Sequence, residues 1–484
     1  MSRIAAILLV ALVAQDIPDH PDKLRYKELT FDVPDASKFR VELKGGSIAY
    51  LAEDRSLPLV ELQIYFKAGS FWDDKGNEGA AAMAGSLMRT GGAGDLAPAQ
   101  FDEEVDFIAA NVDVSIGATN GMATLSVLTK NLDHGLELLG KVLKAPRFEQ
   151  EKLDLLKRQM EQALKARNDA LASIEGREAN FLVYGDFPLN RLPTGDSVDS
   201  IAREDLIAVH RRAVHPKNFI VAAAGDFRRD EFARKLEKLF AEWPFEASPA
   251  PAVPPIKAEP KPGVYTVHKS GENINQGNVT MAHLGIDVRH PDVHSIRIMN
   301  YILGGGGFSS RLTQKVRTEE GLAYDVHSAY GPGVVYREVF AMRFQSKSET
   351  CLYAAQLCLD ELKRMQDAPP SKQEVDEAIR FYLDGFPAFF FSSPFHTMRT
   401  FAYAEFAGIP QDYYRTYRGR IAAVTAEAVQ AAAKKHCHRD KLVFLFVGNI
   451  EEIAKGDGQR AIKLGDFGPV TAVPLPDPLT LERR

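Results

Sequence analysis

The sequence predicts an α+β chain built from two similar halves, each a mostly antiparallel sheet with helices packed on one face. Strand-like and helix-like stretches follow one another in the same order before and after a proline-rich stretch at residues 246–263. The first half closes with HPKNFIVAAAGDF from His215, and the second closes with HRDKLVFLFVGNI from His438. Both stretches join a basic turn to an apolar strand that ends in glycine, which indicates a duplicated α/β unit.

The proline-rich stretch is the clearest boundary in the chain. Proline fixes φ and donates no backbone hydrogen bond, so residues 246–263 are expected to form an extended, semi-rigid linker. Beyond residue 450 the chain reads as a tail whose prolines wrap the surface or are disordered. The predicted parts are a signal peptide at 1–15, an arm at 16–39, an N-terminal domain at 40–245, the linker, a C-terminal domain at 264–450 and a tail at 451–484.

In the first half, alternating apolar residues predict strands and apolar stripes at helical spacing predict helices. Asn120-Gly121 between two alternating runs is a strong hairpin signal, and Asn131 is placed to cap the helix that follows it. The expected strands are 45–52, 59–68, 112–118, 122–129 and 219–224. The expected helices are 80–88, 102–110, a helix after Asn131, 150–167 and 201–209.

The second half repeats this order. Its expected strands are 277–284, 323–329, 338–344 and 442–447. Its expected helices are 294–303, 349–365, 372–383, 397–407 and 426–435. A glycine-rich bend from Gly304 lies between the expected strands 277–284 and 323–329, and a helical run and a turn at Gly321 follow it.

Composition excludes some classes of protein. The formal net charge of -6 gives no basic surface for nucleic acid. Three cysteines rule out a disulfide framework. Cys351 and Cys358 lie two turns apart on one predicted helix, too far apart to bridge each other, and read as small core residues.

The N-terminus has the pattern of an export signal. A short basic start precedes an unbroken apolar run from Ile4 to Ala14. This run is too short to span a bilayer as a helix and suits a signal-peptide core. We therefore expect export to the periplasm or another extracytoplasmic place, with cleavage near Ala14. Because Leu12 is not the small residue preferred there, an unprocessed hydrophobic start stays an alternative.

The stretch GGGGFSSRLTQKVRTEEGLAYDVHSAY from Gly304 contains the candidate site. Arg317 falls near the end of the helical run, and Tyr324 lies just past the turn. The two groups can stand side by side over a cleft, where an Arg fork and a Tyr hydroxyl can both hydrogen-bond a peptide carbonyl. The alternative is a surface Arg beside a half-buried Tyr.

The run SSRL…VRTEEGLAY resembles the C-terminal-half signature of the pitrilysin/insulinase family of zinc peptidases, which includes the mitochondrial processing peptidase. The resemblance extends from about Tyr50 to Asn449. It implies two halves that face each other around a peptide-holding chamber. It also implies that Arg317 and Tyr324 bind the substrate backbone.

The zinc motif of that family, His-x-x-Glu-His, is missing. The matching stretch is GAAAMAGSLMRTGG from Gly79, in which Ala82, Gly85 and Ser86 take the places of the His, Glu and His. None of these three residues can bind zinc well or activate water. Glu161 falls at the position of the family's distant ligand, and its alternative interpretation is a solvated helix residue. We therefore expect no metal and no catalytic residue in this chain.

No other stretch replaces the motif. His134 and Glu137 form half of one, but Leu138 takes the second histidine's place. His290 and His294 lack an adjacent Glu and read as the start of a helix. His436 and His438 read as the ordinary loop before a strand, with an incidental metal site as the alternative. The chain also lacks a nucleophile elbow and a phosphate-binding loop.

Three functions follow, in order of preference. The first is a non-catalytic, peptide-binding subunit of an exported heterodimeric zinc peptidase, because two-chain members of the family keep the zinc in one subunit and the Arg/Tyr pair in the other. Zinc is then expected only in the partner, and the other ligand is the peptide substrate. The second is a stand-alone peptide-binding or scaffold protein. The third is a zinc peptidase with unrecognised ligands.

Overall fold

The computed structural model describes residues 20, 24, 30–246, 249, 252–271 and 274–483. The expected signal peptide at 1–15 lies outside the described residues. Residues Asp35–Arg484 form one compact unit, which contains both sheets. Among the described residues, no helix combines the length and the apolar character needed to cross a membrane.

The first half forms one six-stranded sheet in the order β1-β2-β6-β3-β5-β4. The strands are β1 Arg40–Glu42, β2 Ile48–Glu53, β3 Leu59–Phe66, β4 Asn111–Ile116, β5 Gly121–Leu128 and β6 Ile220–Gly225. The helices are α1 Ala80–Thr90, α2 Pro98–Phe107, α3 Leu132–Lys144, α4 Gln150–Lys165, α5 Leu171–Tyr184, α6 Gly195–Ser200, α7 Arg203–Ala213 and α8 Arg229–Phe240. Only the β2–β6 pair is parallel, and β4 and β5 form the predicted hairpin.

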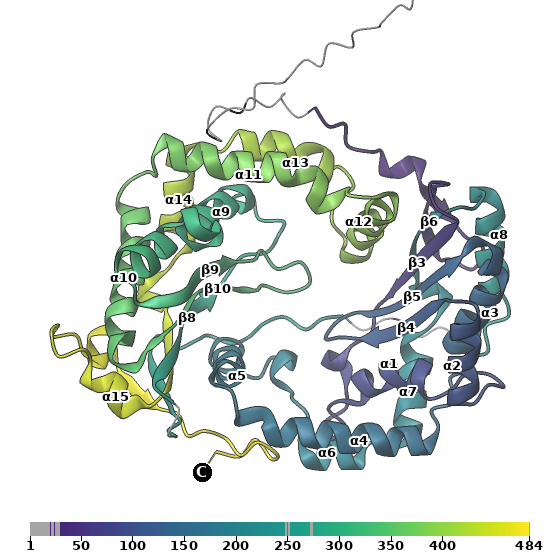
Figure 1. Cartoon of the computed structure of the whole chain (residues 1–484), viewed down its shortest axis with the longest axis horizontal. Coiled ribbons are helices and arrows are strands. Elements are labelled where there is room, and N and C mark those ends of the chain that lie inside the picture. The colour runs from purple at the N-terminus through teal and green to yellow at the C-terminus, as the bar shows by residue number, and fades with distance from the viewer. Residues whose placement is uncertain are drawn as a thin grey trace, which may run out of the picture. The chain divides into compact units, whose positions relative to one another are not determined.

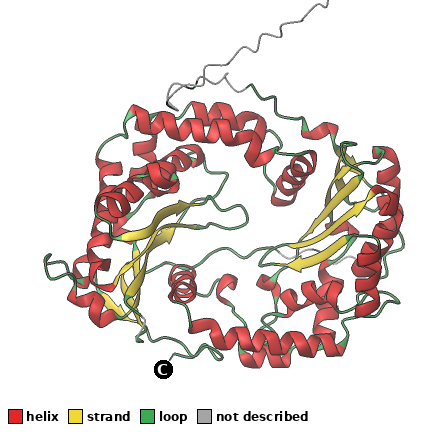
Figure 2. Ribbon diagram, in the orientation of Figure 1, coloured by secondary structure: helices red, strands yellow, loops and turns green. Residues whose placement is uncertain are grey.

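The second half forms a corresponding sheet in the order β12-β7-β11-β8-β10-β9. The strands are β7 Gly263–His268, β8 Gln276–Leu284, β9 Ala323–Tyr330, β10 Val339–Lys347, β11 Val443–Gly448 and β12 Val470–Ala472. The helices are α9 Val293–Asn300, α10 Cys351–Asp367, α11 Lys372–Phe390, α12 Pro394–Ala407, α13 Tyr413–Ala422, α14 Ala426–His436 and α15 Ile450–Lys455. The fold class is α+β with two similar halves, as the sequence predicts (Figure 2).

On one face of each sheet, every second side chain of a strand is buried under the helices of the same half. In β3, Val60, Leu62 and Ile64 are fully buried in the core that helices α1 and α3 cover. The opposite face of each sheet receives a helix from the other half, α12 on β2, β3 and β6, and α5 on β8 and β11 (Figure 1). The sequence predicts helices on one face only, and this exchange adds a second helical layer.

A glutamate anchors each exchanged helix. On α12, Glu405 accepts two hydrogen bonds from the Arg40 guanidinium, both at 3.1 Å, and one from the Tyr50 hydroxyl at 2.6 Å. On α5, Glu175 accepts hydrogen bonds from Asn278, at 2.9 Å, and from Thr280 of β8. Buried carboxylates are costly without such donors, so these bonds fix the register between the two halves.

Several local expectations need correction. Asn131 stands at the start of α3, but its side chain donates to the carbonyl of Ile108 at 3.0 Å and does not cap the helix. Helices α5 and α13 and strand β7 are absent from the predicted elements. In the tail, β12 pairs with β7, and Leu479 then accepts a hydrogen bond from the Gly195 amide at 2.9 Å. Cys351 and Cys358 are buried in the core, as predicted.

Candidate functional site

The glycine-rich stretch reaches the edge strand β9 through two π-helical segments, η8 at Tyr301–Gly305 and η10 at Thr313–Glu319. A side chain at Gly304 would place its Cβ 2.3 Å from the backbone nitrogen of Ser328 on β9. The loop can therefore approach the strand only because residue 304 is glycine. Thr313 on η10 donates to the carbonyl of Val326 at 3.3 Å. These contacts fix η10 beside β9, and π-helical turns are frequent at functional sites.

The side chains of Arg317 and Tyr324 lie side by side. The guanidinium carbon of Arg317 is 4.6 Å from the centre of the Tyr324 ring and 4.7 Å from the centre of the Phe308 ring. Such stacking orients the cation without consuming its N–H donors. Tyr324 is 84% exposed and Phe308 is 67% exposed. Within the described residues, neither the guanidinium of Arg317, which is half-buried, nor the Tyr324 hydroxyl has a hydrogen-bond partner, so their N–H and O–H groups are available to a ligand.

This aromatic sandwich lines a pocket of about 310 Å³ with the glycine loop and the first half of β9. Strand β9 pairs with β10 on one side only among the described strands. Away from η8 and η10, which contact β9 at Ser328 and Val326, its other edge can offer main-chain groups to an added strand. Phe308 is absent from the residues that the sequence singles out, because its contact with Arg317 depends on how the glycine loop folds back on η10.

The base of the site is fixed by Arg311, which belongs to the same motif. Its guanidinium donates to both carboxylate oxygens of Glu374 on α11, at 2.6 and 3.1 Å. Burial raises the pKa of Glu374, but the hydrogen bonds from Arg311 and Ser371 outweigh burial and hold the pKa at about 2. Arg311 therefore has a structural partner, in contrast to Arg317.

Ala82, Gly85 and Ser86 share one face of α1, as spacings of three and four residues require. Ala82 is exposed and Ser86 is half-buried, whereas Gly85 is buried against β4. A Cβ at Gly85 would lie 2.5 Å from the backbone nitrogen of Ile116 and 3.0 Å from its Cγ1. A glutamate cannot occupy this position unless α1 and β4 separate. The donor set offers no imidazole and no carboxylate, so α1 does not fit a zinc ion.

Glu161 of α4 does not complete a ligand set. Its carboxylate pairs with Lys165 one turn along the helix at 2.6 Å. Helix α1 offers Glu161 no second ligand, because Ala82 and Ser86 hold neither an imidazole nor a carboxylate. The geometry matches the interpretation of Glu161 as a solvated helix residue.

The start of α1 holds a buried carboxylate that sequence reasoning also missed. Asp73 accepts the backbone N–H groups of Gly79 and Ala81, both at 3.0 Å. Burial raises the pKa of Asp73 to about 6, although these two hydrogen bonds oppose the shift. Asp73 thus replaces the missing side-chain cap of the helix.

The histidines considered as possible zinc ligands in the sequence have different surroundings in the structure. His134 pairs with Glu104 at 3.2 Å, and His438 donates its backbone N–H to His283 at 3.1 Å. His290 and His436, which sequence analysis treats in two unrelated stretches, come together at Asp292. His294 is buried beside the rings of Tyr413 and Tyr417.

The family models, the relatives and the solved structures that resemble this chain all point to one family. Residues 49–180 match the model of the insulinase family, peptidase family M16, and residues 200–382 match the model of the peptidase M16 inactive domain. A relative in Helicobacter pylori, named non-peptidase homolog YmxG, is 25% identical over 411 residues, which cover 82% of this chain and 90% of the relative. An uncharacterized zinc protease of Streptomyces coelicolor is 26% identical over 260 residues, 52% of this chain and 55% of that protein.

A solved structure shares the fold. The crystal structure of a peptidase M16 inactive domain from Pseudomonas fluorescens superposes with a TM-score of 0.76 at 24% identity. The match covers 84% of this chain and 97% of the other. The relatives thus include proteins named as peptidases and proteins named as inactive.

Proposed function

Because the chain belongs to peptidase family M16, we propose that it is a non-catalytic subunit that binds an extended peptide for a zinc-bearing partner of the same family. The proposal has two parts, the loss of hydrolysis in this chain and the retention of peptide binding. The observation that carries it is the contrast between the closed contact at Gly85 and the open Arg317–Tyr324 pair.

The loss of hydrolysis is supported by packing as well as by residue type. Activation of water needs a metal or a general base within hydrogen-bond reach of the reacting atom. At Gly85 even a methyl group would overlap the backbone of Ile116. The position of the family's general base is thus occupied by the neighbouring strand.

Peptide binding is supported by the donors that the site holds in place. The Arg317 guanidinium can donate a pair of N–H groups to one carbonyl, and the Tyr324 hydroxyl can donate to another. An extended peptide beside β9 would also add main-chain hydrogen bonds to the free strand edge. The rings of Phe308 and Tyr324 offer apolar surface to the peptide's side chains.

The family supports the proposed partner, and the N-terminus supports the proposed place of action. In this proposal the partner contributes zinc and the water-activating glutamate, and this chain contributes only positioning. The apolar run from Ile4 to Ala14 supports export to the periplasm or another extracytoplasmic place.

The test is to reconstitute a complex of this chain with a homologue from the same source that carries the His-x-x-Glu-His motif. We expect the purified chain to be inactive alone, the mixture to cleave a peptide, and Arg317→Ala to reduce kcat/KM in the mixture about 10- to 100-fold. That range corresponds to a charge-assisted hydrogen bond of about 1.5–3 kcal/mol. Arg228→Ala is the matched control, because Arg228 is exposed and pairs only locally with Glu231.

Each alternative outcome has a defined meaning. Activity of the lone chain with bound zinc would refute the loss of hydrolysis. An inactive mixture in which the chain still binds peptide would favour the stand-alone binding or scaffold role. Equal activity of the Arg317→Ala and Arg228→Ala mixtures would refute the role of the Arg/Tyr pair.

A further inference from the structure

Two segments far apart in the sequence place two imidazoles and one carboxylate at a single point. His290 and Asp292 stand in the turn before α9, and His436 is the last residue of α14. One ligand atom from each of the three residues lies within 4.8 Å of the others. We propose that His290, Asp292 and His436 form a binding site for a divalent transition metal ion, with Zn²⁺ as its preferred occupant.

The distances are close to those of a coordination sphere. One oxygen of Asp292, Oδ2, lies 2.7 Å from Nε2 of His436 and 3.9 Å from Nδ1 of His290. Ligand atoms that each bind one zinc ion at about 2.0–2.2 Å lie roughly 3–4 Å apart. The 2.7 Å hydrogen bond between Asp292 and His436 would have to lengthen by roughly 0.5–1 Å for both atoms to bind one ion. Nδ1 of His290 now accepts the Asp292 backbone N–H at 3.1 Å. A metal ion on Nδ1 would take the same lone pair, so this hydrogen bond would break and the Asp292 amide would keep its proton.

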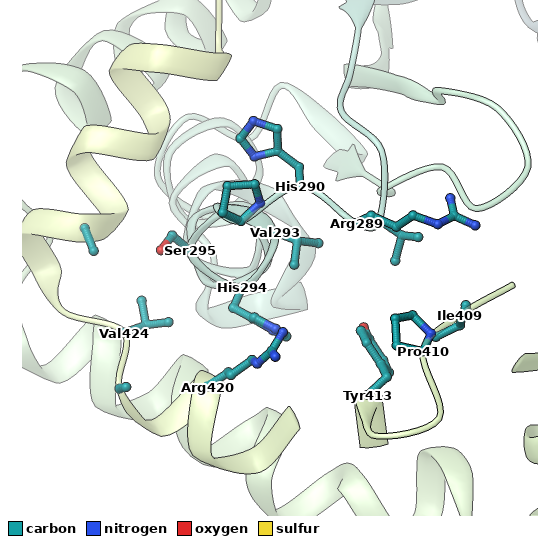
Figure 3. Close-up of a pocket in the computed structure, with 14 residues that line it drawn as sticks. Arg289, His290, Val293, His294, Ser295, Ile409, Pro410, Tyr413, Arg420 and Val424 are labelled. Carbon is teal, nitrogen blue, oxygen red and sulfur yellow. The ribbon is translucent and has the colours of Figure 1, made fainter. Parts of the chain in front are cut away.

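The residue types select the metal. Two imidazoles and a carboxylate suit Zn²⁺ and its neighbours in the first transition row, whereas Mg²⁺ and Ca²⁺ require oxygen ligands. Three protein ligands leave a fourth position for water or another donor. His290 also lines a pocket of about 480 Å³ (Figure 3), but Asp292 and His436 do not, so the proposed ion would lie beside that pocket's wall and not inside it.

The ammonium of Lys435 competes with a metal ion for Asp292, so the proposal predicts the direction in which a Lys435 variant changes zinc affinity. Its ammonium lies 2.8 Å from the same Asp292 oxygen and supplies positive charge where the metal would bind. Lys435 is 60% exposed at its side chain, so it can turn away into solvent. Removing this ammonium removes a competitor for Asp292, and zinc affinity should increase.

The site lies on different elements from the degenerate motif of α1, and it joins α9 to α14. Nothing in the proposed peptide-binding role requires it. Its test therefore uses metal binding and melting temperature, with no peptidase assay, so that failure of one proposal leaves the other intact.

The experiment uses the full chain, purified without a polyhistidine tag and stripped of metal. Zn²⁺ is titrated against a competing chromogenic chelator, and Co²⁺ absorption reports the ligand geometry. We expect one equivalent of zinc to bind and to raise Tm. We expect at least a 10-fold loss of affinity in His290→Ala and in Asp292→Asn, and at least a twofold gain in Lys435→Ala. His134→Ala is the matched control, since His134 also pairs with one carboxylate, and its affinity should stay unchanged.

His436 is largely buried, so His436→Ala is interpreted only where its circular dichroism matches the wild type. His290→Ala and Asp292→Asn change half-buried groups and keep the test decisive if His436→Ala fails to fold. The proposal is overturned if no zinc binds, if His290→Ala and Asp292→Asn bind zinc as the wild type does, or if Lys435→Ala weakens binding.

Discussion

Gly85→Ala is the most direct test of the conclusion that the zinc motif cannot be accommodated in α1. The added Cβ would stand 2.5 Å from the Ile116 backbone nitrogen, about 0.5 Å closer than real Cβ contacts allow. Overpacking of this kind costs about 1–3 kcal/mol. Replacing glycine by alanine inside a helix returns about 0.5–1 kcal/mol. We therefore expect a net loss of up to about 2.5 kcal/mol for one methyl group, and a larger loss for Gly85→Glu.

The assay is thermal unfolding of the two variants beside a matched control. Gly176 lies inside α5, and a Cβ there would meet nothing within 4 Å. Gly176→Ala should therefore raise Tm slightly, whereas Gly85→Ala should lower it by up to about 3 °C, because about 1 kcal/mol corresponds to about 1 °C in a compact unit as large as Asp35–Arg484. The triple variant Ala82→His, Gly85→Glu, Ser86→His should have a lower Tm than Gly85→Ala and should bind no stoichiometric zinc at α1. Equal gains in Tm for Gly85→Ala and Gly176→Ala would refute the packing argument.

Three further predictions follow from described contacts. Phe308→Ala removes one of the two rings that stack on the Arg317 guanidinium. Because an exposed cation–π contact contributes about 0.5–1 kcal/mol, the Kd for a peptide, measured by fluorescence anisotropy, should increase about two- to fivefold. An unchanged Kd would exclude Phe308 from the site. Glu405→Gln removes the ion pair between α12 and Arg40, which keeps only Glu42 as a charge partner. The free energy of unfolding in urea should fall by about 1–3 kcal/mol, and no change would mean that this ion pair does not hold α12. Burial raises the pKa of Asp73 to about 6, so its contribution to stability is present below about pH 4 and is lost as the pH rises through 6. Relative to the wild type, Asp73→Asn should gain up to about 3 kcal/mol between pH 4 and 7 in urea unfolding, and a relative loss over that interval would contradict the assignment.

The local periods of the sequence account for most of the observed elements. The alternation from Val60 to Phe66 predicts β3, and Asn120-Gly121 predicts the β4–β5 hairpin. Such patterns depend on neighbours within a few residues, where sequence spacing and spatial contact coincide. The juxtaposition of Arg317 and Tyr324 has the same origin, because one turn at Gly321 separates them.

The missed features depend on contacts between distant parts of the chain. Helix α5 has no single apolar stripe, because its buried residues include Glu175, whose partners Asn278 and Thr280 belong to the other half. Strand β12 has only exposed residues and is identified by its pairing with β7 alone. The cluster of His290 and His436 likewise requires the packing of α9 against α14. No pattern within one segment contains that information.

The two halves use glycine in the same way at corresponding places. Gly85 lets α1 approach the edge strand β4 at Ile116, and Gly304 lets η8 approach the edge strand β9 at Ser328. Both contacts bring backbone against backbone, which leaves no room for a side chain between helix and strand. A catalytic half needs the reverse, since its general base must project from the helix beside the strand. The first half of this chain is therefore packed like the second, non-catalytic half, and restoration of zinc chemistry would need a movement of α1 as well as three substitutions.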